Sequence, residues 1–93
     1  MTTPSTSLQK ACRLLRALTD ARNSRLTDLA LAAGVDKASA LRLLETMAAE
    51  GLVQRDPATK AFTPGREWLA LHAATLARTD LRPLVRPGLI RLA

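Results

Sequence analysis

The chain has 93 residues, which is enough for one small folded domain and too few for two. Hydrophobic residues make up 47% of it, but only Phe62 and Trp68 are aromatic, so the core must come mainly from leucine, alanine and valine, as in packed helices. A net charge of +6 favours a polyanion such as nucleic acid as the partner. Cys12 is the single cysteine, which excludes an internal disulfide. Because the sequence has neither an apolar run of about 18 residues nor a signal peptide, we expect no membrane span and a cytoplasmic location.

The first predicted element is an amphipathic helix over residues 7–20, which follows a small, polar tail at residues 1–6 that we expect to be disordered. Ser7 is the predicted N-cap of this helix. The expected buried stripe follows spacings of three and four residues and consists of Leu8, Ala11, Leu15 and Leu18.

Two further helices are predicted, with a short turn between them. The first covers residues 26–33, and Gly34 supplies the left-handed residue at its end. Asp36 would cap the next helix, which runs to about Glu50 and ends at Gly51. Its expected buried stripe is Ala40, Leu43, Leu44 and Met47. Two helices joined by such a turn are typical of a helix-turn-helix, here at about residues 26–50.

Two short strands are predicted next, over residues 52–55 and 61–63. The Asp56-Pro57 pair between them favours a tight turn, so the strands would form a hairpin, or wing, at about residues 52–63.

The remaining residues predict two more helices. The first begins near residue 66, and its expected packed face is Trp68, Leu69, His72, Ala73 and Leu76. The second would be capped by Asp80 and would carry Leu81, Leu84, Val85, Leu89 and Leu92. Its apolar face is unfinished at Ala93, so we expect these residues to be part of a longer protein.

The third predicted helix would turn one strip of side chains to solvent near its start. That strip consists of Lys37, Ala38, Leu41, Arg42 and Glu45. The major groove of DNA, about 12 Å wide, admits a helix, and in it arginine or lysine reads guanine while apolar groups meet the thymine methyl group. Arg42 is the candidate for the first role, and Leu41 or Ala38 for the second.

Further candidates surround this strip and would hold the phosphate backbone. Two lie beside the amide groups of the same helix N-terminus, two begin the preceding helix, and three come from the hairpin. In that order they are Lys37 and Ser39, Arg25 and Thr27, and Arg55, Thr59 and Lys60. The hairpin could lie along the backbone or reach the neighbouring minor groove.

These candidates also have purely structural interpretations. Leu41 could pack on the wing or on the first helix. Arg42 could pair with Glu45 or Asp28, although such exposed pairs contribute at most about 1 kcal/mol. Ser39 could serve as a local capping residue, and the lysines could be solvated surface charges.

No residue set indicates catalysis, a metal site or a cofactor. His72 is the single histidine and has no partner at ligand spacing, so packing is its expected role. Cys12 is expected to act as a small apolar residue rather than as a redox sensor. Since the sequence has no glycine-rich phosphate loop and no nucleophile with a histidine base at motif spacing, we expect no enzyme.

Four segments, in this order and spacing, resemble the N-terminal DNA-binding region of the IclR family of bacterial transcription regulators. They are LTDLA at Leu26–Ala30, GVDKASALRLL at Gly34–Leu44, EGLV at Glu50–Val53 and DPAT at Asp56–Thr59. The resemblance covers nearly the whole chain from Ser7 onward. Asp36, Ala38, Lys60 and Pro64 stand where the family usually has proline, serine, glycine and leucine. Lys60 is therefore expected to need a positive φ or a different turn.

The resemblance implies a mainly helical winged helix-turn-helix domain at residues 7–65, with three helices and a two-stranded wing, followed by linker and dimerisation helices at residues 66–93. It also implies a homodimer, often a dimer of dimers, bound to a double-stranded DNA operator. A small-molecule effector would act through a further C-terminal domain that is absent from these residues. The predicted function is sequence-specific DNA binding in transcription regulation. The alternative is a winged-helix module that binds protein partners through the same exposed strip.

Overall fold

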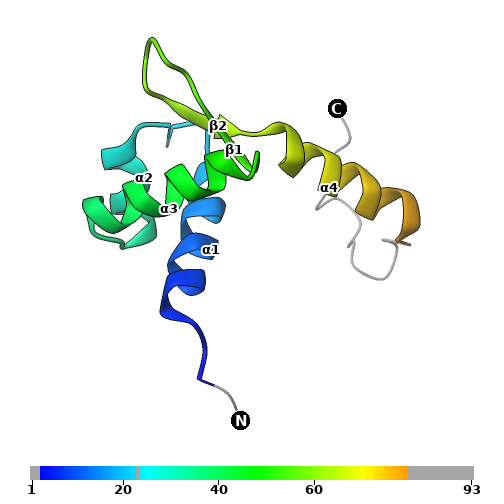
Figure 1. Ribbon diagram of the computed structural model, residues 1–93, viewed down its shortest axis with the longest axis horizontal. Helices are drawn as coiled ribbons and strands as arrows, with labels where there is room; N and C mark the ends of the chain where they lie inside the picture. Colours follow the sequence, from blue (N-terminus) through cyan, green and yellow to red (C-terminus); the bar gives the residue numbers. More distant parts are fainter. Residues whose placement is uncertain (1–2, 23, 80–93) are drawn as a thin grey trace.

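The computed structural model describes residues 3–22 and 24–79, which form four helices and one two-stranded sheet (Figure 1). In chain order these elements are α1 (Thr6–Leu18), α2 (Leu26–Ala33), α3 (Lys37–Ala49), β1 (Val53–Arg55), β2 (Phe62–Pro64) and α4 (Arg66–Arg78). This order confirms the predicted winged helix-turn-helix fold. The helix predicted from Asp80 onward lies outside the described residues.

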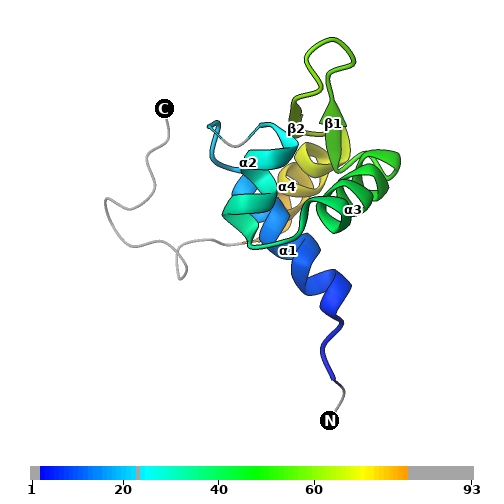
Figure 2. The same ribbon diagram turned by 90° about the vertical axis from the view of Figure 1, so that its left-hand side faces the viewer.

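The first three helices pack around one apolar core, and Figure 2 shows α2 and α3 on either side of α1. Leu14, Leu29 and Leu44, one from each helix, are completely buried at its centre. Each such leucine stabilises the fold by about 1.5 to 3 kcal/mol through its removal from water. α1 therefore supports the helix-turn-helix pair from one side and leaves the opposite side of that pair at the surface.

α1 begins earlier than predicted, and its buried stripe is shifted: Leu18 is buried and Ala11 and Leu15 pack against the core as expected, but Leu8 does not. Ser5 caps it, not Ser7, by accepting a hydrogen bond from the N–H of Leu8 at 3.3 Å. Leu14 is fully buried although it lay outside the predicted stripe, whereas Leu8 is 64% exposed. The cause is tertiary, because α1 is contacted by α2, α3 and β2 while its first turn extends past them (Figure 1).

The turn between α2 and α3 is fixed by three adjacent residues. Gly34 has a φ of +67°, as predicted for the left-handed end of α2. Val35 is buried, and its N–H donates to the carbonyl of Ala30 at 3.0 Å. The carboxylate of Asp36 accepts a hydrogen bond from the N–H of Ser39 at 2.9 Å, which confirms the predicted cap of α3. Hydrogen bonding from Ser39 also holds the pKa of Asp36 below its ordinary value.

The wing is the antiparallel hairpin of β1 and β2. Both strands begin one residue later than predicted. Leu52 lies in the turn after α3 rather than in β1, because its N–H donates to the carbonyl of Met47 in α3 at 2.9 Å. Ala61 closes the turn by accepting a hydrogen bond from the N–H of Asp56 at 2.8 Å. Lys60 has a φ of +65°, which confirms the positive φ expected at this position.

One hydrogen bond and one side chain tie the wing to the segment before α2. The N–H of Phe62 donates to the carbonyl of Ser24 at 2.6 Å. The Phe62 side chain is almost completely buried in the core. The wing is therefore held at a fixed position beside the start of α2.

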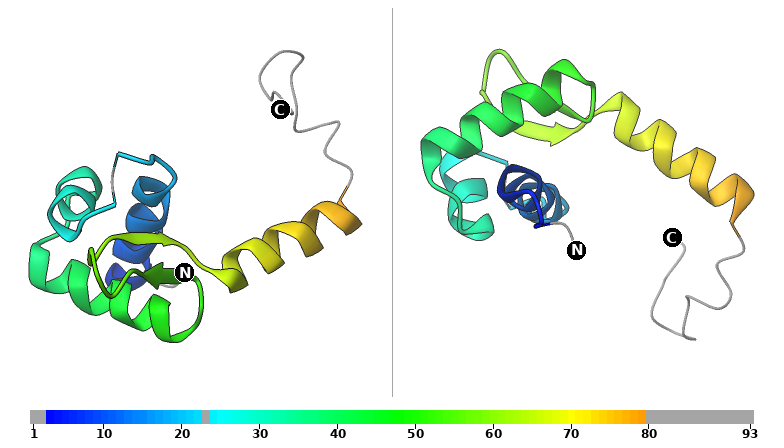
Figure 3. Two further views of the ribbon diagram at one scale, coloured as in Figure 1. Left: turned by 90° about the horizontal axis from the view of Figure 1, so that it is seen from above. Right: turned by 60° about the horizontal axis from the view of Figure 1, so that its bottom comes forward.

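α4 projects away from the three-helix core (Figure 3). Its start is fixed by two hydrogen bonds, from the N–H of Gly65 to the carbonyl of Leu52 at 2.8 Å and from the N–H of Glu67 to the carbonyl of Gly51 at 3.0 Å. Beyond these anchors no residue of α4 is buried.

The predicted packed face of this helix, Trp68, Leu69, His72, Ala73 and Leu76, is therefore wrong for the described residues. Trp68 is half-buried and the other four are exposed. The periodicity is amphipathic, but the described part of the chain offers α4 no partner surface.

Among the described residues, no helix combines the length and the hydropathy that a membrane span requires.

Replacing Gly65 with alanine is expected to destabilise the domain by about 3 kcal/mol, because the added Cβ would meet fixed backbone atoms. These are the Gly51 carbonyl oxygen and, at 2.9 Å, the carbonyl carbon of Leu52. Gly34→Ala serves as the comparison, since its Cβ meets nothing within 4 Å and its cost arises from the positive φ. That cost is about 1 kcal/mol. Urea unfolding of both variants measures the difference, and an equal or larger loss for Gly34→Ala would contradict the close approach.

Acid is expected to weaken the fold through Asp20 and Asp36. Hydrogen bonds from Arg22 lower the pKa of Asp20 from 3.8 to about 2, and those from Ser39 lower the pKa of Asp36. Because both pKa values are depressed in the folded state, the stabilisation is present above about pH 4 and is lost as the pH falls toward 2. Urea midpoints measured between these pH values should fall less steeply for the double variant Asp20→Asn and Asp36→Asn than for the unchanged chain. An unaltered slope would show that these carboxylates do not carry the effect.

Candidate nucleic-acid interface

One side of α3 faces solvent and the other is buried. Ala40, Leu44 and Met47 are buried, whereas Lys37, Ala38, Arg42 and Glu45 are exposed. The predicted inward and outward sides of this helix are thereby confirmed, except that Leu43 of the inward side and Leu41 of the outward strip are both half-buried. The outward strip is accessible to a large partner.

Arg42 and Leu41 differ in how freely they are presented. Arg42 forms no ion pair within the described part of the chain, so the pairing with Glu45 or Asp28 considered above is not formed there. Leu41 is half-buried and packs against the core, which leaves only part of its side chain for other contacts. Of the two, Arg42 is the more available to a ligand.

A depression of about 260 Å³ brings together several of the predicted phosphate-binding residues from three elements. We call it the basic depression, and its lining residues are Arg25, Leu26, Thr27, Lys37, Arg55 and Lys60. Four of the six side chains are cationic, and no carboxylate lines it. The start of α2, the start of α3 and the wing thus form one basic surface.

The wing cations are held by the hairpin itself. The guanidinium carbon of Arg55 lies 4.7 Å from the centre of the Phe62 ring, a cation–π contact. Its Nε also donates to the carbonyl of Lys60 at 3.2 Å. The sequence predicted Arg55 as a DNA contact, but it did not predict that Phe62 would support the Arg55 side chain. Phe62 is one of only two aromatic residues in the chain, and this scarcity was the signal that could have indicated its role.

The turn at the wing tip uses its own polar groups. The carboxylate of Asp56 accepts hydrogen bonds from the N–H groups of Ala58 at 2.7 Å and Thr59 at 3.2 Å. The hydroxyl of Thr59 accepts one from the N–H of Ala61 at 3.3 Å. Thr59 does not line the basic depression, and its hydroxyl is engaged in the turn.

The N-termini of α2 and α3 differ in their electrostatics. At α3 the carboxylate of Asp36 already occupies the N–H of Ser39, and this negative charge disfavours a second anion there. The N–H and the hydroxyl of Ser39 both bond to this carboxylate, which is the local capping role considered above. At α2 the N-cap position is Arg25, and no side chain in the described residues caps the helix. The first amide groups of α2 therefore have no side-chain acceptor, although the first turn of this helix carries the carboxylate of Asp28.

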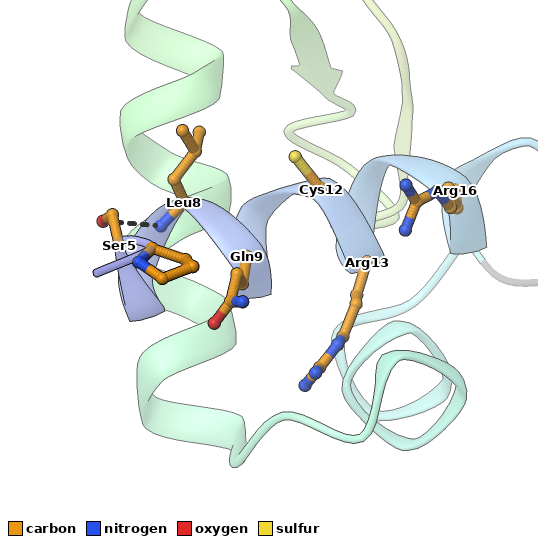
Figure 4. A pocket seen from close by; sticks show the side chains of 7 residues that line it. Ser5, Leu8, Gln9, Cys12, Arg13 and Arg16 are labelled. Carbon is orange, nitrogen blue, oxygen red and sulfur yellow. Dashed lines mark hydrogen bonds between the residues drawn. The ribbon is translucent and has the colours of Figure 1, made fainter. Parts of the chain in front are cut away.

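Two other features do not belong to this interface. Leu8, Cys12, Arg13 and Arg16 help to line a hollow along α1, with Cys12 half-buried (Figure 4). His72 is exposed on α4. No group of three histidine, cysteine or carboxylate side chains gathers within the described residues in a way that could hold a metal ion.

Comparison with known proteins agrees with this geometry. The sequence matches the IclR helix-turn-helix domain over residues 7–57. It is 36% identical over 77 residues to the glycerol operon regulatory protein of Streptomyces griseus, covering 82% of this chain and 30% of that protein.

Solved structures show the same arrangement. The IclR transcriptional regulator of Alicyclobacillus acidocaldarius matches with a TM-score of 0.77 and 28% identity, over 87% of this chain and 33% of that one. Pseudomonas aeruginosa HmgR matches with a TM-score of 0.72 and 27% identity, over 83% of this chain and 32% of that one. The chain thus spans about a third of the length of these relatives. Because the family match covers more than half of the chain and the described fold agrees with it, the chain belongs to the IclR family of transcription regulators and carries its helix-turn-helix DNA-binding domain.

Proposed function

We propose that this domain binds a double-stranded DNA operator sequence-specifically, with α3 in the major groove and the wing against the sugar-phosphate backbone or the minor groove. The observation that carries the proposal is the exposed strip of α3 beside the basic depression. A helix of this kind fits the major groove, and clustered cations without carboxylates attract phosphate. The domain thereby contributes to transcription regulation in the cytoplasm, through binding rather than catalysis.

Residues of the strip read bases and residues around it hold the backbone. Arg42 is unpaired among the described residues and can donate two hydrogen bonds to guanine. Ala38 and the exposed part of Leu41 offer apolar contact to thymine methyl groups. The proposed backbone contacts are Arg25, Thr27, Lys37, Ser39, Arg55, Thr59 and Lys60.

A homodimer is the proposed binding unit, with α4 as part of its interface. Leu69 and Leu71 are each 59% exposed and Leu76 is 44% exposed on a helix that has no buried residue. Apolar side chains concentrated on one projecting helix are typical of an association surface. A two-fold dimer would place two copies of α3 about 34 Å apart, one turn of the DNA duplex. Pairs of such dimers, as in a dimer of dimers, would extend the operator further.

A small-molecule effector would act through a domain outside these residues. The family resemblance implies such a domain, and the chain covers only 30% to 33% of the relatives described above. The described residues would then supply DNA recognition, and the effector would change how two such domains are presented.

Arg42→Ala is expected to reduce affinity for the operator selectively. The operator is first selected from a pool of random duplexes, and binding is then measured on it and on an unrelated duplex at two salt concentrations. Loss of a bidentate guanine contact costs about 1 to 3 kcal/mol on the operator and little on the unrelated duplex. Lys60→Gln, by contrast, should weaken binding to both duplexes.

Equal losses on the two duplexes for Arg42→Ala would contradict its assignment to base reading. An affinity for DNA that does not fall as salt increases would contradict DNA binding itself, and would favour a module for protein partners.

Leu69→Asp is expected to shift the protein from dimer to monomer, because it places a charge on the apolar side of α4 that Leu69 shares with Leu76. Sedimentation velocity reports the change against the chain mass of 10.0 kDa. Leu31→Asp is the matched control, since Leu31 is 82% exposed on α2, away from α4. If the two variants dissociate alike, or neither does, α4 is not the interface.

A further inference from the structure

We infer that the basic depression binds one phosphodiester group of the DNA backbone. Side chains from α2, α3 and the wing contact this same group. The inference rests on the proposed function and goes further, because it fixes the wing on the backbone rather than in the minor groove. It also predicts that cations distant in the sequence share a single phosphate.

Four cationic side chains from three parts of the chain converge on the basic depression. Arg25 begins α2, Lys37 begins α3, and Arg55 and Lys60 belong to the wing, yet all four line one depression of about 260 Å³. A hollow of this size arranges the charges around one anion instead of along a row of phosphates. Four like charges in one hollow repel one another, and a bound anion relieves that repulsion.

Neighbouring carboxylates form no ion pair with these four cations among the described residues. Asp36 accepts a hydrogen bond from the N–H of Ser39 and caps α3. Asp56 accepts hydrogen bonds from the N–H groups of Ala58 and Thr59 within the wing turn. Asp28, in the first turn of α2, forms no ion pair with a described residue. None of these three carboxylates lines the depression. The positive charge is therefore available to a ligand.

The uncapped start of α2 adds to this charge. No side chain in the described residues caps α2, whereas α3 is capped by a carboxylate. The partial positive charge of a helix N-terminus favours an anion. Because Asp28 places a carboxylate in the first turn of α2, the four lining cations supply most of the attraction for the phosphate, and Lys37 reaches it from α3.

Contacts within the wing and with the segment before α2 hold the wing in place. Arg55 stacks on Phe62 and its Nε binds the carbonyl of Lys60, while the N–H of Phe62 is bonded to the carbonyl of Ser24. These contacts hold the wing cations beside α2 before DNA arrives, which reduces the entropy lost on binding. Minor-groove readers instead insert side chains between or against the bases.

The test uses the selected operator duplex with one methylphosphonate linkage at a time, which removes the charge of a single phosphate. We expect one linkage in each half-site at which the unchanged protein loses about tenfold in affinity. Lys37→Gln and Lys60→Gln should each weaken binding to the normal duplex. Both losses should shrink strongly on the duplex that lacks this one charge, because groups that share a partner are not additive.

Arg78→Gln is the charge-matched control, since Arg78 is exposed at the far end of α4. The neutral linkage should retain its full effect in that variant. If Lys37→Gln and Lys60→Gln lose their effects at two different linkages, or if the Lys60→Gln loss depends on minor-groove base changes instead, the shared phosphate is overturned while DNA binding stands. A protein that binds no duplex overturns the proposed function instead.

Discussion

The exposed strip of α3 depends on how completely the opposite side of the helix is buried. Ala40 and Leu44 are fully buried against the other helices, and Val35 is buried in the turn that precedes them. Rotation of α3 about its axis would return a leucine to water at a cost of about 1.5 to 3 kcal/mol. Arg42 can therefore stay unpaired within the described residues without loss of stability. Stability and recognition are assigned to opposite sides of one helix.

The starts of α2 and α3 differ in their side-chain caps, and this difference affects how each interacts with an anion. The carboxylate of Asp36 stabilises the start of α3 but also places a negative charge there. α2 begins at Arg25 with no side-chain cap in the described residues, and it lies beside the cations of the wing. The start of α3 is thus less favourable to an anion than the cationic depression beside α2. Base reading and backbone binding can then take place on adjacent surfaces without competing.

α4 shows how a small domain leaves amphipathic surface uncovered. Its start is fixed by the close approach of Gly65 to Gly51 and Leu52, so its direction is set by backbone contacts. Further along, its leucines are exposed because the three-helix core is already complete without them. α4 is thus anchored at one end and leaves exposed leucines along an amphipathic helix.

Local rules were sufficient to predict the order of the elements, the left-handed Gly34 and the Asp36 cap, whereas the positive φ of Lys60 was one of two alternatives that the family resemblance implied. Each depends on the backbone preference of one residue or on a side chain three positions away. The roles of Leu8 and Leu14 in α1 and the exposure of α4 were predicted wrongly, since both depend on which segments are present to pack against. Every cationic candidate was identified from its residue type and its place in the motif, but their gathering into one depression was not. That gathering results from the packing of α2 against α3 and from the hydrogen bond between Phe62 and Ser24, long-range contacts that no periodic pattern encodes.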